Sequence, residues 1–130
     1  MAKRIDSATV IGNALIFTQK KQITKEELYQ YYEIVDKLLP NDYYTAELSF
    51  DSFCYYFDFL VKRIDDTIII DCDTELLQRY FQMGISIEIL NIFELSAIKL
   101  NEIGEQTSQI TSEQENIFAL RKRIKSILKS

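Results

Sequence analysis

Residues that interrupt helices and strands or form tight turns are scarce in this chain, which has three glycines and one proline among its 130 residues. All-β sandwiches and barrels join many short strands through turns, and such turns draw on glycine and proline. The scarcity therefore argues against an all-β fold and favours helices. Because 130 residues is the size of one typical domain, we expect one globular domain rather than two.

Apolar residues recur at three- and four-residue steps along much of the chain, which is the spacing of one helix face. Thr24 and Glu27 form a capping box: the Thr24 hydroxyl can accept a hydrogen bond from the Glu27 N–H, while the Glu27 carboxylate accepts from the Thr24 N–H. This box predicts a helix that begins at Thr24 and ends before Pro40. The same spacing predicts further helices over residues 7–20, 49–61, 74–83, 86–104 and 113–129.

The run from Thr67 to Ile70 is β-branched throughout, which predicts a short strand. We expect its backbone to pair either with residues near 43–48 or with a second copy of the chain. Residues 43–61 are rich in aromatic side chains, so helix and strand both stay open for that segment. The expected fold class is mainly α: five or six helices in a single domain, with one short strand or β-hairpin and a separable C-terminal amphipathic helix.

The last third of the chain carries a heptad repeat, in which isoleucine recurs at positions 103, 110, 117 and 124. The repeat is strong only from residue 117 onward, because Gln106 and Glu113 occupy the places that correspond to Leu120 and Ile127. This spacing is typical of the seam between two packed helices. The polar residues 107–112 are poor helix formers and predict a break before the last helix. We therefore expect a helical globular domain over residues 1–106 and a basic C-terminal helix over residues 107–130. The residues expected to form a dimer seam, or to dock on the chain's own core, are Ile117, Leu120, Ile124 and Ile127.

Charge is distributed unevenly around the net value of −5. Residues 26–117 carry nineteen acidic and five basic residues, whereas residues 118–130 carry five basic residues and no acidic one. A basic amphipathic tail can contact an acidic protein surface or nucleic acid. The residues expected to make such an anion or nucleic-acid contact are Arg121, Lys122, Arg123 and Lys125.

The chain lacks the residues that several common kinds of catalysis require. The chain has no histidine, which is the commonest general base near neutral pH and the commonest transition-metal ligand. Its two cysteines, Cys54 and Cys72, form no C-x-x-C motif, and its glycines form no phosphate-binding loop. We therefore expect no enzymatic activity, no cofactor and no metal.

Acidic residues cluster around the predicted strand, at positions 65, 66, 71, 73 and 75. Carboxylates at the end of a strand can bind a hard cation such as Mg²⁺ or Ca²⁺. A calcium loop counted from Asp71, however, would need glycine and glutamate at the positions of Leu76 and Gln82. We interpret the cluster as solvated residues that bound the strand.

The expected function is that of a non-enzymatic protein–protein interaction module, such as a small regulator, inhibitor or assembly adaptor. Tyrosines come in adjacent pairs, and two neighbours cannot both face the same narrow core, so some must reach the surface. The expected partner-binding residues are Tyr31, Tyr32, Tyr55 and Tyr56. The chain has no apolar stretch typical of a signal peptide or membrane span, and its few cysteines suit a reducing compartment, so we expect a cytoplasmic protein.

A second hypothesis is a dimeric, winged-helix-like DNA-binding regulator that uses its basic termini. Three helices followed by a strand is the element order of a winged helix-turn-helix. Against it, the sequence shows no second wing strand, and residues 39–49 are longer than the usual turn between the two DNA-binding helices. The acidic isoelectric point of about 4.8 also differs from the basic character of DNA-binding domains.

Overall fold

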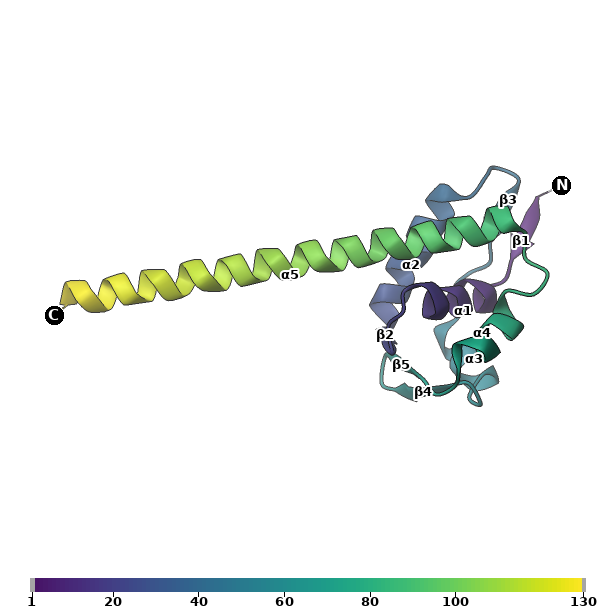
Figure 1. Cartoon of the computed structure of the whole chain (residues 1–130), viewed down its shortest axis with the longest axis horizontal. Helices are drawn as coiled ribbons and strands as arrows, with labels where there is room; N and C mark the ends of the chain where they lie inside the picture. The colour runs from purple at the N-terminus through teal and green to yellow at the C-terminus, as the bar shows by residue number, and fades with distance from the viewer. Residues whose placement is uncertain (1, 130) are drawn as a thin grey trace. The chain divides into compact units, whose positions relative to one another are not determined.

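A computed structural model describes the backbone of residues 2–129 and the side chains of residues 2–106 and 123–125. The chain separates into two compact units, Met1–Leu100 and Asn101–Ser130. The helices, labelled in Figure 1, are α1 (Ser7–Phe17), α2 (Lys25–Leu38), α3 (Phe50–Tyr56), α4 (Thr74–Phe81) and α5 (Ile87–Lys129). The strands are β1 (Lys3–Ile5), β2 (Gln22–Thr24), β3 (Tyr43–Thr45), β4 (Val61–Ile64) and β5 (Thr67–Ile70).

Two β-sheets show that the prediction of a mainly α fold with one strand or hairpin is wrong. Strands β1 and β3 pair in parallel, and β2, β5 and β4 form an antiparallel sheet in that order. Three of the five strands are only three residues long, which is too short to display the period-two alternation that marks a strand in a sequence. The fold is therefore mixed α/β.

The strand predicted over Thr67–Ile70 is confirmed as β5, but its predicted partners are wrong. Ile68 lies opposite Ile23 of β2, and Ile69 lies opposite Lys62 of β4. The segment over residues 43–61 contains both alternatives, since β3 and α3 lie within it and β4 begins at its end. The predicted helix over residues 49–61 ends at Tyr56 because the backbone turns there and then enters β4.

Helix α1 is the central element of the first unit, and it contacts α2, α3 and α4. All of its residues from Val10 to Ile16 are buried. At Gly12 a Cβ atom would lie 2.1 Å from Cγ of Phe81, so the lack of a side chain lets α4 approach closely. Asn13 joins the same two helices, because its Nδ2 donates to the Phe81 carbonyl at 3.0 Å and its Oδ1 accepts from Gln82 Nε2 at 3.0 Å.

The capping box predicted at the start of α2 is confirmed. The Glu27 N–H donates to Thr24 Oγ1 at 3.1 Å, and the Thr24 N–H donates to Glu27 Oε1 at 3.2 Å. Burial by itself would raise the pKa of Glu27, but hydrogen bonds from Lys20 and Thr24 outweigh it and hold that pKa below its ordinary value. The helix ends at Leu38, and Pro40 follows two residues later, as predicted.

In the first unit, α5 buries Ile89, Phe93, Ala97 and Leu100. The Tyr31 hydroxyl of α2 donates to the Phe93 carbonyl at 3.0 Å and so links α2 to α5. The backbone of α5 continues through residues 107–112, where the sequence predicts a break, because no proline in that stretch forces the chain out of the helix. The predicted domain boundary between residues 106 and 107 stays a prediction.

Candidate protein-interaction surface

Helix α3 directs aromatic side chains outward because its opposite face is fixed in the core. Phe50, Phe53 and Cys54 are buried, at the spacing of one helix face. Tyr55 and Tyr56 therefore point away from the core, and they are 76% and 69% exposed. Their rings meet edge to face with centroids 5.2 Å apart.

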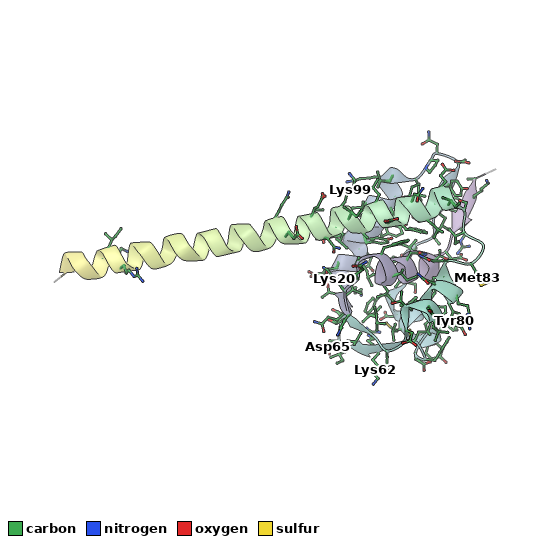
Figure 2. The ribbon with its side chains drawn as sticks, in the orientation of Figure 1. Lys20, Lys62, Asp65, Tyr80, Met83 and Lys99 are labelled. Atoms are coloured by element: carbon green, nitrogen blue, oxygen red, sulfur yellow. The ribbon has the colours of Figure 1, made fainter. Side chains whose placement is uncertain are left out.

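Two further exposed rings contact each other. Phe59, in the turn after α3, and Tyr80, on α4, are 55% and 52% exposed, and their centroids are 5.4 Å apart. Tyr80 is labelled in Figure 2. The Phe59 ring also lies 6.1 Å from that of Phe57, which packs against the buried Phe81. We call Tyr55, Tyr56, Phe59 and Tyr80 the aromatic surface.

Acidic side chains accompany this surface, since Asp51 and Asp58 are both exposed. The nearby basic residues of β4 are engaged by carboxylates. Arg63 Nη1 lies 2.6 Å from Asp51 Oδ1, and Lys62 Nζ lies 3.6 Å from Asp71 Oδ2. Asp58 therefore adds negative charge beside the apolar rings, whereas Arg63 offsets the charge of Asp51.

A groove of about 400 Å³ adjoins the aromatic surface at Tyr56. Its walls come from α3, from the first turn of α1 and from the loop before α3, including Ser52, Phe53, Ser7, Ala8 and Ala46. Interface hot spots commonly insert into such pockets in the partner. The groove is therefore suited to take one partner side chain while the exposed rings contact the rest.

The structure separates the four tyrosines predicted to bind a partner. The prediction that Tyr31 binds a partner is wrong, because this residue is fully buried and its hydroxyl is hydrogen-bonded inside the core. Its position three residues after Leu28 and four before Val35 places it on the buried stripe of α2. Tyr32 is half-buried, and its hydroxyl lies 3.4 Å from the Thr45 carbonyl. Of the four, Tyr55 and Tyr56 are the well-exposed pair.

Sequence reasoning missed Phe59 and Tyr80. Phe59 lies outside the apolar stripe of the predicted third helix, and that offset was the available signal of exposure. Tyr80 lies on the apolar stripe of α4, but a helix of eight residues buries only Leu77 and Phe81 fully. A short helix thus buries fewer residues than the apolar face of its sequence contains.

The predicted residues of the C-terminal helix are only partly described. Ile124 is 48% exposed, and Arg123 and Lys125 are also exposed. Others lie outside the described side chains, and these are Ile117, Leu120, Arg121, Lys122 and Ile127.

The acidic cluster around β5 does not converge on one point in the described residues. That part of the chain contains no group of three or more His, Cys, Asp or Glu side chains placed to hold a metal ion. Asp71 pairs with Lys62, and Asp65 forms the turn between β4 and β5 with a φ of 52°.

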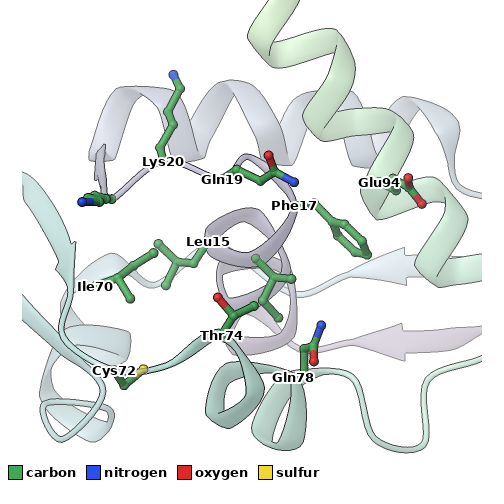
Figure 3. A pocket seen from close by; sticks show the side chains of 11 residues that line it. Leu15, Phe17, Gln19, Lys20, Ile70, Cys72, Thr74, Gln78 and Glu94 are labelled. Atoms are coloured by element: carbon green, nitrogen blue, oxygen red, sulfur yellow. The ribbon is translucent and has the colours of Figure 1, made fainter.

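A cavity of about 820 Å³ lies between the end of α1, the end of β5 and the start of α4 (Figure 3). Leu15, Phe17 and Ile70 form its apolar lining, and Cys72 lies at its edge. Lys20 points away from these residues in Figure 3 and pairs with Glu27. The titratable side chains around the cavity are Lys20, Lys21, Cys72 and Glu94.

Cys72 is expected to react with iodoacetamide more slowly than free cysteine at neutral pH. Burial raises the pKa of its thiol, and the carboxylates of Asp73 and Asp71 raise it further, so less of the reactive thiolate is present. The measurement is the alkylation rate against pH in a Cys54→Ala variant, in which Cys72 is the one remaining cysteine. Asp73→Asn should speed the reaction. A rate equal to that of free cysteine in both proteins would contradict this prediction.

Comparison with known proteins identifies no relative, since no protein family, no curated protein and no solved structure matches the chain. The class of protein is therefore defined by fold and surface alone. It is a small mixed α/β unit that exposes aromatic side chains on α3, on α4 and in the turn after α3.

Proposed function

We propose that this chain is a non-enzymatic protein–protein interaction module that binds its partner through the aromatic surface. The observation that carries the proposal is the set of four aromatic rings, from residues 55–59 and 80, each more than half exposed. Tyrosine and phenylalanine are enriched at interfaces because one rigid ring buries a large apolar area on binding. Such a module would act on its partner as a small regulator, an inhibitor or an assembly adaptor.

The chemistry of the surface specifies the kind of partner. The unit Met1–Leu100 carries sixteen acidic and ten basic residues, so its field attracts positively charged proteins. Lysine and arginine side chains also stack on tyrosine rings through cation–π contacts. We therefore propose a protein partner whose contact surface combines apolar and basic side chains.

DNA binding is the second candidate function, and one observation favours it. Apart from the separate β1–β3 pair, the order α1, β2, α2, α3, β4, β5 and the sheet order β2-β5-β4 resemble those of a winged helix-turn-helix, in which β4 would be the second wing strand. In that fold α3 would read the major groove. Here it presents Asp51 and Tyr55, whereas phosphate contacts need unpaired lysine and arginine. These side chains favour a protein over DNA as the partner.

We place this activity in the cytoplasm as part of the same proposal. Both cysteines are free thiols, which suits a reducing compartment. Among the described residues, no helix is sufficiently long and apolar to span a membrane.

Photo-crosslinking tests the proposed surface. A benzoyl-phenylalanine introduced at Tyr55 should crosslink one protein in cells, and the same group at the control position Tyr44 should not. Tyr44 suits this role because it is 47% exposed and lies on β3, outside the aromatic surface. With the purified partner, the double substitution Tyr55→Ser and Tyr56→Ser should weaken binding at least about tenfold, as expected for interface hot spots. Tyr44→Ser should leave the affinity unchanged.

Two outcomes would contradict the proposal. One is equal crosslinking from positions 55 and 44, which would mean that the aromatic surface has no special role. The other is binding of duplex DNA that falls steeply with salt and is lost on neutralising Lys122, Arg123 and Lys125, which would support the second candidate.

A further inference from the structure

The second unit consists of one helix. Within residues 101–129, as far as the structure describes them, the backbone is the continuation of α5. A helix of this length gains most of its stability from tertiary packing rather than from intrinsic propensity. Its residues 104–112 include glycine, threonine and serine, which are poor helix formers. Such a helix requires another surface to pack against.

The sequence of the helix specifies a heptad seam that is fully apolar from Ile117 onward, since Gln106 and Glu113 occupy the second seam position of the two earlier heptads. Isoleucine lies at positions 103, 110, 117 and 124, and Leu120 and Ile127 add the second seam position of the last two heptads. Ile124, whose side chain is described, is 48% exposed. In one continuous helix these positions share a face, and a seven-residue repeat is the pattern by which two helices pack together.

Charge along the same helix is divided into two halves of opposite sign. The acidic residues come first, at positions 102, 105, 113 and 115, and the basic residues follow, at positions 121, 122, 123, 125 and 129. A parallel pair of such helices would set like charges beside each other at every level. An antiparallel pair with Ile103 level with Ile127 would instead set the acidic end, Glu102 and Glu105, beside the basic end, Lys125 and Lys129, which is favourable.

We propose that residues 101–129 pair with the same residues of a second copy of this chain in an antiparallel coiled coil. The seam then brings Ile103 of one copy level with Ile127 of the other. Glu113, which occupies a seam position, lies level with Ile117 of the second copy rather than with a second Glu113. This dimer is independent of the proposed function, because it uses none of the residues of the aromatic surface.

Oligomeric state tests the seam in the full chain. Light scattering coupled to size-exclusion chromatography should give the mass of a dimer. Ile117→Asp places a charge in the seam and should raise the dimer dissociation constant by about 100-fold or more. Ser108→Asp, on the opposite face of the helix, is the matched control and should leave the dimer intact. A monomeric wild-type chain would overturn the proposal.

Cysteine crosslinking tests the orientation without disturbing the charges. In a Cys54→Ala/Cys72→Ala background, oxidation of a mixture of the Ile103→Cys and Ile127→Cys proteins should join the two different chains. Disulfide-linked Ile103→Cys homodimers would instead show a parallel pair and overturn the antiparallel arrangement. Salt gives a second readout: added NaCl should weaken an antiparallel dimer, since it screens attraction between opposite charges, and would strengthen a parallel one.

Discussion

Replacing Gly12 with alanine is expected to lower the free energy of unfolding by about 1–3 kcal/mol, the usual cost of overpacking a core. The new Cβ would lie 2.1 Å from Cγ of Phe81, so one of the two helices must shift. Phe81 cannot easily yield, because its ring packs 5.6 Å from that of Phe53 and 5.0 Å from that of Phe57. Urea unfolding followed by circular dichroism measures the loss.

Gly104→Ala is the matched control for this substitution. Gly104 is also helical, but nothing lies within 4 Å of a Cβ built there, so alanine should leave stability unchanged or raise it by about 0.5–1 kcal/mol. In a Phe81→Ala background the obstructing ring is gone, and Gly12→Ala should then cost little. An equal loss at Gly12 with and without the Phe81 ring would contradict the proposed clash.

Sequence patterns predicted the parts of the fold that depend on local interactions. The capping box at Thr24 and Glu27 involves residues three apart, and the β-branched run at β5 is continuous, so both are visible in the sequence. The pairing of Lys3 with Tyr43 joins segments about forty residues apart, and three-residue strands leave no pattern of their own. The mixed α/β class depends on those non-local pairings, which is why the mainly α prediction is wrong.

The candidate site was predicted only in part, because local patterns are visible in the sequence and tertiary contacts are not. Adjacent tyrosines had to include surface residues, and Tyr55 and Tyr56 are indeed exposed. Adjacency alone does not show which of Tyr31 and Tyr32 is buried. The three-residue spacing from Leu28 does, because it places Tyr31 on the buried face of α2. Tyr80 joins Phe59 through tertiary packing of α4 beside the turn after α3, and no local pattern contains that contact.

Strand β4 supports the alternative proposal of DNA binding, but protein binding remains the preferred proposal. In the proposed alternative of DNA binding, β4 and the antiparallel β5 would form the wing. The basic residues of β4, however, pair with Asp51 and Asp71. Because these cations are already paired, we propose a protein rather than DNA as the partner.

Replacing Tyr31 with alanine is expected to lower the free energy of unfolding by about 3–5 kcal/mol, as for other large buried aromatic residues. Its ring is fully buried, and its hydroxyl donates to the Phe93 carbonyl at 3.0 Å, so the substitution leaves a cavity and breaks the link between α2 and α5. Tyr55→Ala is the control: that side chain is 76% exposed, and its loss should change stability by no more than about 0.5 kcal/mol. Equal losses in urea unfolding would contradict the burial of Tyr31.

Tyr31→Phe separates the hydroxyl from the ring. At neutral pH it should cost about 0.5–1.5 kcal/mol, the net value of one hydrogen bond. Burial holds the pKa of Tyr31 well above its ordinary value of 10.0, so the phenol ionises in the unfolded chain before it does so in the folded one. Its contribution to stability is therefore complete below about pH 10 and is lost as the pH rises toward the higher folded value. Phenylalanine cannot ionise, so the wild type should lose its stability advantage over Tyr31→Phe as the pH rises. Urea unfolding at a series of alkaline pH values measures this difference. The lysines titrate in both proteins and therefore cancel in the comparison. An advantage that stays constant with pH would mean that the Tyr31 hydroxyl is open to water.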